Sequence, residues 1–370
     1  MRGVCWPETF LGFHPLVEVL IAYLRRFVSR RIDEGSSSHI RFFFVLLAIA
    51  SISFAQAPPD ALGTIQSSST TCEGTISGGV CYALDITCPA LPNYTAYVKI
   101  LNPTAAVVGT AVFVTGGSGT DLLELLTDGP IVVEQLLNNG YRIAELTYGI
   151  PFNTKEQGWE TNANGAGIRA AACRFATVQQ WVHDNFLDAN TPLCAAGNSA
   201  GAELIGQSLA HYGAGDILSF AELSSGPPYG QLQYACENTQ PVMNSPCSGL
   251  SLGLDLQAAT AKQFVDPAYP GNWCSSSHFN HSKLHDAQFL NDSVLAPDAV
   301  LSYPNTFVNF IFGDQDTTSA IRQGLLYEAA ITSAHASACL PGVGHEVETY
   351  KAGAKRVASD MIAGCKLPAK

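Results

Sequence analysis

The sequence predicts an α/β protein with a mostly parallel central sheet and helices on both faces. From residue 95 onward, short apolar runs alternate with longer stretches whose apolar residues recur at helical spacing. Short links join them, and this alternation is typical of parallel strands connected by crossover helices. The chain has 370 residues, of which 47% are hydrophobic, so it can bury one large core.

The predicted strands are short apolar or β-branched runs bounded by glycine, proline or polar clusters. We expect them at 97–101, 111–114, 142–148, 193–196, 217–221 and 307–312. The predicted helices lie at 121–138 with a break at Pro130, at 166–188, from about 200 to Tyr212, at 318–331 and at 346–363. Residues 58–90, rich in Ser, Thr, Gly and Cys, are expected to form an irregular segment held by disulfides.

Residues 226–304 interrupt the alternation and show little periodicity. An ordered insertion of this length between core elements is typical of a lid or cap. It contains His278, His281 and His285, which could ligate a metal from one helical face. Their Ser- and Asn-rich flanks favour a solvated cap surface instead, so we expect neither a metal nor a cofactor.

The first 57 residues indicate export. Arg41 precedes the apolar run 42–50, and Ala55-Gln56-Ala57 follows, which together resemble a signal peptide cleaved near Ala57. Residues 1–40 displace this signal from the N-terminus, and one interpretation is that the protein starts further downstream. The alternative is a membrane anchor through residues 42–54, although that run is short of the roughly 20 residues of a span. We therefore expect a secreted, extracellular protein.

The cysteines agree with export, because an even number in an exported chain predicts disulfides. We expect up to five bridges, with Cys236 paired to Cys247 or Cys274, and Cys339 paired to Cys365. The ten cysteines beyond the signal are Cys72, Cys81, Cys88, Cys173, Cys194, Cys236, Cys247, Cys274, Cys339 and Cys365. Glycosylation is predicted at the sequons of Asn93, Asn280 and Asn291.

The formal net charge is −12, and no basic cluster follows the signal. Such a surface repels polyanions, so we expect no nucleic-acid partner. After signal cleavage we also expect no stable membrane insertion.

The strongest motif is Gly197-Asn198-Ser199-Ala200-Gly201, which matches G-x-S-x-G between a predicted strand and a predicted helix. A nucleophile at the tip of such a turn needs near-side-chain-free neighbours two residues away. The turn exposes the Ser199 hydroxyl and directs the Ala200 amide at a developing oxyanion. The alternative is an ordinary turn serine.

At these residues the chain resembles the α/β-hydrolase superfamily, in its esterase and lipase branch, over roughly residues 95–365. The resemblance implies the α/β-hydrolase fold with a disulfide-containing lid or cap at about 226–304. Residues 58–370 would then form a single catalytic domain.

The stretch Thr115-Gly116-Gly117-Ser118-Gly119 follows a predicted strand. In the family a glycine-rich loop at this place supplies a second oxyanion-hole amide. We expect that amide to come from Gly117, or else from Ser118. Many relatives begin this loop with His, where this chain has Thr115. The alternatives are a structural turn or a phosphate loop, and the Lys of a phosphate loop is absent.

The triad acid and base are expected near the C-terminus. In Gly313-Asp314-Gln315-Asp316, the family spacing selects Asp316, with Asp314 and Glu222 as alternative acids. These acids could instead cap the helix that begins near Thr318. His345 lies in a glycine-rich loop before the last helix, where the family has its base, and completes the order Ser, Asp, His.

The residues predict a serine hydrolase that cleaves carboxylic esters through an acyl-enzyme on Ser199. Its substrate could be a small molecule or a polymer. A peptidase, an amidase or an acyltransferase would use the same triad, and a secreted binding protein could retain the scaffold without catalysis.

Overall fold

The computed structural model describes residues 58–149, 158–239, 247 and 256–367. The expected signal peptide and the alternative anchor at 42–54 lie outside the described residues.

Nine strands form one sheet in the order β1-β2-β3-β5-β4-β6-β7-β8-β9. The strands are β1 Thr64–Thr70, β2 Val80–Thr87, β3 Tyr94–Leu101, β4 Gly109–Val114, β5 Tyr141–Thr147, β6 Leu193–Asn198, β7 Leu218–Ser224, β8 Phe307–Gly313 and β9 His335–Leu340. Pairing is parallel from β5 to β9 and antiparallel from β1 through β3 to β5. The predicted mostly parallel sheet is confirmed.

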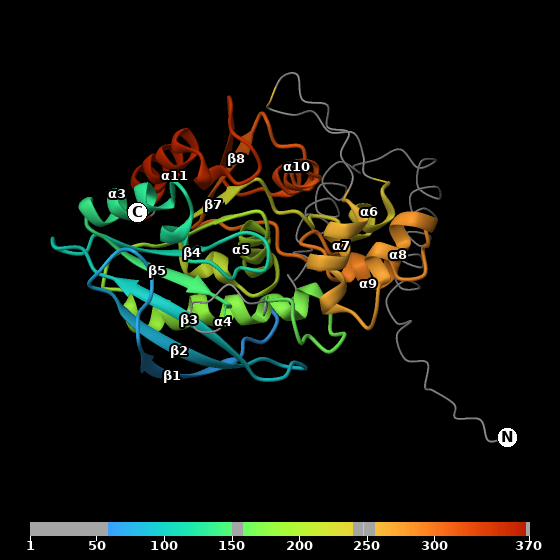
Figure 1. Cartoon of the computed structure of the whole chain (residues 1–370), viewed down its shortest axis with the longest axis horizontal. Helices are drawn as coiled ribbons and strands as arrows, with labels where there is room; N and C mark the ends of the chain where they lie inside the picture. Colours follow the sequence, from blue (N-terminus) through green and yellow to red (C-terminus); the bar gives the residue numbers. More distant parts are fainter. Residues whose placement is uncertain (1–57, 150–157, 240–246, 248–255, 368–370) are drawn as a thin grey trace, which may run out of the picture. The chain divides into compact units, whose positions relative to one another are not determined.

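Helices cover both faces of this sheet (Figure 1). On one face α3 (Gly129–Asn138) and α11 (Lys351–Gly364) pack together over the strands. On the other lie α4 (Ile168–Phe186), α5 (Ala200–His211) and α10 (Ala320–Ala330). A short 3-10 turn, η1 (Leu123–Leu125), precedes α3, so Pro130 begins the second part of the stretch predicted at 121–138.

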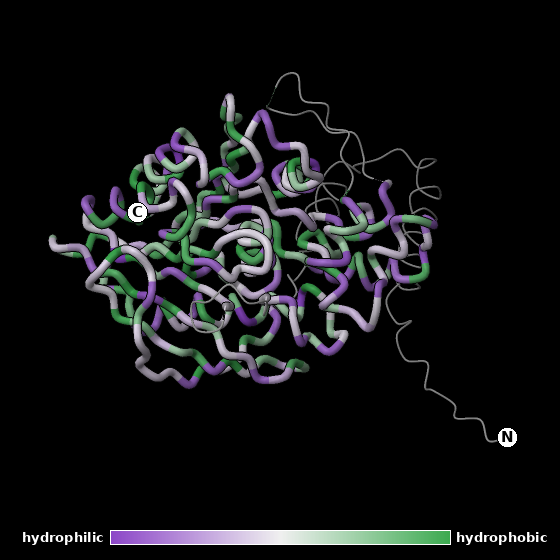
Figure 2. Tube along the Cα trace, in the orientation of Figure 1, coloured by the Kyte–Doolittle hydropathy of each residue, from purple (hydrophilic) through white to green (hydrophobic). Residues whose placement is uncertain are grey.

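Alternation along the strands builds two separate apolar clusters. In β4, Ala111 and Phe113 face the α3 and α11 side, whereas Val112 and Val114 face the α4 and α5 side. All four side chains are buried, as expected of a central parallel strand covered on both faces. Figure 2 shows apolar and polar stretches interleaved along the described chain.

The expectation of an irregular segment at 58–90 is wrong, because β1 and β2 form there as an antiparallel pair. β1 carries Ile65 as its one large apolar residue, and most of the strand is exposed, so it lacks the alternation that marks a half-buried strand. Pairing to β2 satisfies the backbone groups on one side of the strand, and the disulfide Cys72–Cys81 closes the connection. β9 was not expected either, and like β1 it is an edge strand of the sheet.

The insertion between β7 and β8 forms a cap of short helices. They are α6 (Leu232–Glu237), α7 (Ala258–Phe264), α8 (Trp273–Asn280) and α9 (Asp286–Asn291), labelled together in Figure 1. Short helices on variable turns explain why the sequence shows no sustained periodicity there. The disulfide Cys236–Cys274 joins α6 to α8.

The structure pairs all ten cysteines of residues 58–370. The expected partnership of Cys236 with Cys274 is confirmed, but the expected bridge between Cys339 and Cys365 is wrong. Cys339 instead joins Cys247, so β9 is tied to the cap, and Cys365 joins Cys194 at the start of β6. The two cysteines are near each other in sequence but not in space, because α11 carries Cys365 back across the sheet. The remaining bridge is Cys88–Cys173.

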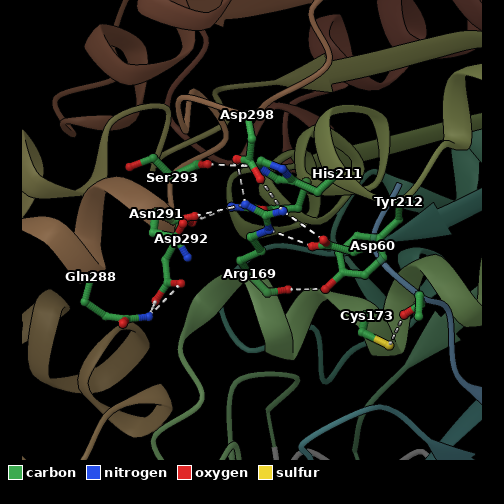
Figure 3. Close-up of polar contacts among 12 residues, drawn as sticks. Asp60, Arg169, Cys173, His211, Tyr212, Gln288, Asn291, Asp292, Ser293 and Asp298 are labelled. Atoms are coloured by element: carbon green, nitrogen blue, oxygen red, sulfur yellow. Dashed lines mark hydrogen bonds and ion pairs between the residues drawn. The ribbon is translucent and has the colours of Figure 1, made fainter. Parts of the chain in front are cut away.

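The first described residues are attached to the domain through Arg169 of α4 (Figure 3). Its guanidinium donates to Asp60 at 2.6 and 2.9 Å, and to Asp298 at 2.9 and 3.0 Å. The Asp60 amide also donates to the carbonyl of His211 at 2.7 Å. One cation therefore joins the N-terminal segment, α4 and the chain that returns from the cap.

Candidate active site

The sheet brings two loops together at a point where its strand order reverses. The connection that leaves β4 leads to β5 and the connection that leaves β6 leads to β7, so these two neighbouring strands are followed by connections that run in opposite directions along the sheet. Crevices at the carboxyl ends of strands at such a point are the usual ligand sites of open α/β sheets. The loop 115–119 follows β4 there, and Ser199 follows β6.

Ser199 occupies a strained turn between β6 and α5. Its φ of +52° and ψ of −114° are unusual for a residue with a side chain. The flanking glycines are required by space: a Cβ on Gly197 would lie 2.6 Å from the carbonyl carbon of Gly201. A Cβ on Gly201 would overlap the carbonyl oxygen of Val114. The turn therefore holds Ser199 against the end of β4.

Three predicted residues that are distant in sequence meet at this edge. The Nε2 of His345 lies 2.8 Å from the Oγ of Ser199, and its Nδ1 lies 2.9 Å from the Oδ2 of Asp316. With Nδ1–H donating to the carboxylate, Nε2 is the acceptor for the serine hydroxyl. This is the geometry of a serine nucleophile, a base and an orienting acid.

Asp316 is buried and ionised. Burial alone would raise its pKa, but the hydrogen bond and charge of His345 and the bonds from Thr318 outweigh it, and the pKa is lowered. The main-chain N and the Oγ1 of Thr318 each donate to Asp316 Oδ1 at 2.8 Å. The same Oγ1 lies 3.0 Å from His345 Nδ1, so Thr318 contacts both members of the pair.

The two alternative acids lie elsewhere. Asp314 accepts from the amide of Gly342 at 2.7 Å, so it supports the loop that carries His345 without contacting the imidazole. Glu222 is buried in β7 and accepts from the side chain of Asn309 at 3.0 and 3.3 Å. Burial raises the pKa of Glu222 well above its ordinary value. Among the three candidates, Asp316 is the one that the structure brings to His345.

The candidate oxyanion donors face the same cavity as Ser199. Ala200 is the first residue of α5, where an amide has no partner inside its own helix. Gly117 and Ser118 line the same cavity as Ala200. Gly117 has φ +59°, which suits glycine.

A cavity of about 600 Å³ opens over these residues. Tyr229, Leu256 and Phe264 of the insertion contribute an apolar wall, and Leu123 and Leu126 contribute another. The insertion therefore covers the site, as expected of a cap. Within the described part of the chain, no group of three or more His, Cys, Asp or Glu side chains is placed to hold a metal ion.

None of the described helices is both long enough and apolar enough to cross a bilayer. The three sequon asparagines, Asn93, Asn280 and Asn291, are all exposed. Their glycosylation stays a prediction.

Four residues near the site were missed from the sequence. Thr318 follows the Asp-x-Thr spacing of a side-chain turn, which could have indicated its contact with Asp316. The side-chain amide of Asn198 donates to the carbonyl of His345 at 2.8 Å, and no local sequence pattern indicates that contact. Glu160 accepts from Ser118 Oγ at 2.7 Å, and Glu348 lines the cavity.

Burial raises the pKa of both missed carboxyl groups. The pKa of Glu160 rises to about 7, although the hydrogen bond from Ser118 and the charge of Arg174 both lower it. The pKa of Glu348 also rises to about 7, although Ser224 and His345 lower it. At neutral pH each group is therefore present in both its charged and its neutral form.

No protein-family model and no curated protein sequence matches the chain. Among solved structures, a puromycin hydrolase matches with a TM-score of 0.50 and 13% identity, over 82% of this chain and 39% of that protein. The chain thus spans about two fifths of its length. An arylesterase matches with a TM-score of 0.47 and 14% identity, over 93% of this chain and 96% of that one. A Pyrobaculum calidifontis esterase matches with a TM-score of 0.47 and 16% identity, over 91% and 97%.

Proposed function

We propose, from the α/β-hydrolase fold of this chain, that it is a secreted serine hydrolase that cleaves carboxylic esters through an acyl-enzyme on Ser199. One observation carries the proposal. The hydroxyl of Ser199, the imidazole of His345 and the carboxylate of Asp316 are linked by contacts of 2.8 and 2.9 Å. A serine in this arrangement is activated as a nucleophile by the neighbouring base.

In the acylation step, Nε2 of His345 removes the proton of Ser199 as Oγ attacks the ester carbonyl carbon. Asp316 stabilises the imidazolium that forms. The tetrahedral oxyanion accepts hydrogen bonds from the amide of Ala200 and from that of Gly117 or Ser118. The C–O bond to the leaving alcohol then breaks, and His345 returns its proton to that oxygen.

In the deacylation step, water replaces the alcohol. His345 removes a proton from the water as its oxygen attacks the acyl carbon, and the same amides hold the second oxyanion. The Ser199–acyl bond breaks, Ser199 regains the proton from His345, and the carboxylic acid leaves.

A fluorophosphonate probe tests the nucleophile directly. We expect stoichiometric labelling that maps to the peptide containing Ser199 and that is lost in Ser199→Ala. Ser319→Ala is the matched control, because Ser319 also lines the cavity, and it should still be labelled at Ser199. Failure of the folded protein to label, together with no turnover of any ester, would favour the secreted binding protein.

Ester, amide and acyl-transfer chemistry are separated by matched substrates. We expect hydrolysis of a p-nitrophenyl ester to exceed that of the corresponding p-nitroanilide by several orders of magnitude. Faster cleavage of the anilide would instead support a peptidase or amidase. Product that is mainly a new ester when glycerol is added would support an acyltransferase.

The lining of the cavity favours neutral or cationic substrates. Asp121, Glu346 and Glu348 are among its described lining residues, and no Lys or Arg is among them. At a pH where these carboxyl groups are ionised, an anionic acyl group would meet like charges in a partly dry cavity, where repulsion is poorly screened. Among p-nitrophenyl esters of similar size, we expect kcat/KM to fall from a trimethylammonium acyl chain to a neutral one and to a carboxylate.

The domain boundaries and the secretion are proposed with the activity. Residues 58–370 form the single catalytic domain, with a cap at 226–304, after removal of a signal peptide ending near Ala57. N-terminal sequencing of the exported protein should begin near Pro58. Recovery of the activity with the membrane fraction, released only by detergent, would support the anchor at 42–54.

A further inference from the structure

The loop that follows β4, residues 115–119, is here called the oxyanion loop. It contains the candidate amides of Gly117 and Ser118. Its backbone has φ +59° at Gly117 and +67° at Gly119. Glycine adopts positive and negative φ with similar ease, so the loop's own sequence selects no single orientation for these amides. Hydrogen bonds, within the loop and from outside it, must therefore contribute to their orientation.

The orientation of both amides is determined through the carbonyl oxygens behind them. In a trans peptide unit, the carbonyl oxygen and the following N–H point in opposite directions. The ring N–H of Trp159 donates to the carbonyl of Gly117 at 3.3 Å, so the N–H of Ser118 points away from Trp159. The amide of Gly119 donates to the carbonyl of Gly116 at 3.0 Å. Because this carbonyl and the N–H of Gly117 belong to one peptide unit, the bond fixes the direction of the N–H of Gly117 as well.

Glu160 holds the side chain of the same loop. Its Oε1 accepts from Ser118 Oγ at 2.7 Å, and the main-chain N of Trp159 donates to the carbonyl of Ser118 at 3.2 Å. Two consecutive residues thus make three hydrogen bonds to Gly117 and Ser118. Trp159 and Glu160 are both buried, so water does not compete freely for these bonds.

The segment that carries the pair is itself fixed to α4. Arg174 donates from Nη1 to the carbonyls of Trp159 and Thr161, both at 2.6 Å. Its guanidinium lies 4.2 Å from the ring centroid of Tyr94. The Tyr94 hydroxyl donates to the carbonyl of Gly158 at 3.1 Å. Trp159 and Glu160 are therefore backed by rigid elements of the core.

We propose that Trp159 and Glu160 are positioning residues that hold the oxyanion loop, Trp159 through its ring N–H and Glu160 through the hydroxyl of Ser118. Neither residue lines the catalytic cavity, so they act through the loop and not on substrate. The inference depends on the proposed hydrolase function, because it needs an oxyanion to be stabilised. Since that charge develops in the transition state, the pair contributes to kcat more than to KM.

Kinetics on a neutral p-nitrophenyl ester test the pair. Complete loss of one oxyanion donor costs about 10²–10³ in rate, so a loosened donor should cost about 10 to 100-fold. We expect that loss in kcat, with KM within about threefold, for Glu160→Ala, Ser118→Ala and Trp159→Phe. Glu160→Gln keeps an oxygen that accepts from Ser118 and should retain most of the wild-type kcat.

A double-mutant comparison isolates the contact. If Glu160 acts through Ser118, the variant carrying both Glu160→Ala and Ser118→Ala should lose no more kcat than either single variant. Asp292→Ala is the control for removal of a buried carboxyl, because Asp292 accepts from Tyr269 and Gln288 and lies outside the cavity lining. It should lower the melting temperature but leave kcat unchanged.

The results of these experiments distinguish failure of the positioning role from failure of the proposed hydrolase function. Ester turnover that needs Ser199, with kcat unchanged in folded Glu160→Ala and Ser118→Ala, overturns the positioning role alone. Additive losses in the double variant also overturn it. Absence of Ser199-dependent turnover in the wild-type protein removes the proposed function and this inference together.

Discussion

The side-chain amide of Asn198 donates to the main-chain carbonyl of His345 at 2.8 Å, and to that of Ser224 at 3.2 Å. The residue before the proposed nucleophile thus holds the loop that carries the proposed base. In Asn198→Ala, both carbonyls lose this donor, and a bond of this kind contributes about 0.5–1.5 kcal/mol. We expect kcat to fall about tenfold with a small change in KM, as measured by steady-state ester hydrolysis.

Asn185→Ala is the matched control for Asn198. Asn185 makes the same amide-to-carbonyl bond, to Trp181 at 2.8 Å, but at the exposed end of α4. It should leave kcat unchanged. Equal kcat in the two variants would show that the contact between Asn198 and His345 does not position the base.

Replacement of the two aspartates after β8 distinguishes the orienting acid. Asp316→Asn removes the charge that stabilises the imidazolium, and comparable replacements in triads cost on the order of 10⁴ in kcat. Asp314→Asn affects an aspartate that bonds Gly342 and is partly exposed, so kcat should stay within about threefold. The reverse order of activities, measured at saturating substrate, would transfer the acid role to Asp314.

Two glycines of α5 should respond in opposite ways to an added methyl group. At Gly201 the Cβ would overlap the carbonyl of Val114, so Gly201→Ala should lower the free energy of unfolding by about 1–3 kcal/mol and reduce kcat. At Gly206 the nearest atoms would lie 3.5 Å away, in ordinary contact with Pro227 and Val294. Gly206→Ala should therefore be neutral, or stabilising by about 0.5–1 kcal/mol.

Denaturant titration and the hydrolysis rate measure both effects. Equal stability of the two variants would mean that the turn at Ser199 can shift to make room. That result would contradict the strained geometry described for it.

Buried carboxyl groups should make the fold less stable at alkaline pH. Burial raises the pKa of Glu203, like those of Glu160 and Glu348, to about 7 from an ordinary 4.5. The folded state therefore binds more protons than the unfolded state between these values, and stability is lost as pH rises through about 7. Burial lowers the pKa of His211 to about 4, and this opposes the trend only below its ordinary value of 6.5. We expect a lower melting temperature at pH 8.5 than at pH 6.5.

Glu145 offers a variant test of this trend. Burial and the charge of Glu124 raise its pKa, and its Oε1 accepts from the amide of Glu124 at 2.8 Å. Glu145→Gln keeps an accepting oxygen but cannot ionise, so it should raise the free energy of unfolding at pH 8.5 by about 1–3 kcal/mol. Exposed Glu134→Gln is the control and should leave the melting temperature unchanged at both pH values. A parallel decline in wild type and Glu145→Gln would show that Glu145 does not contribute to the loss of stability at alkaline pH.

The central part of the fold could be predicted because its strands are covered on both faces. β4 and β6 appear as uninterrupted buried runs, so their composition alone identifies them. β1 has no such signal, since Ile65 is its one large apolar residue and its stability comes from pairing with β2. Cys339 was misassigned for a related reason, because its partner Cys247 is distant in sequence and lies in a cap without periodicity.

The candidate site, like the fold, could be predicted only in part. The surroundings of Ser199 are visible in the sequence because steric crowding there admits only glycine at 197 and 201. The supporting contacts are not, because Asn198 and Glu160 are ordinary polar residues until the sheet brings distant segments beside them. Sequence reasoning placed the hydroxyl, the imidazole and the carboxyl that the structure joins, but not the residues that orient them.

The attachment of Asp60 by Arg169 has a practical consequence for recombinant work. Trimming the chain beyond Asp60 would leave a half-buried guanidinium with Asp298 as its remaining carboxylate, and would free the segment that leads to β1. Affinity tags and fusion partners are therefore better joined upstream of Pro58 through a flexible spacer, or placed after the last helix.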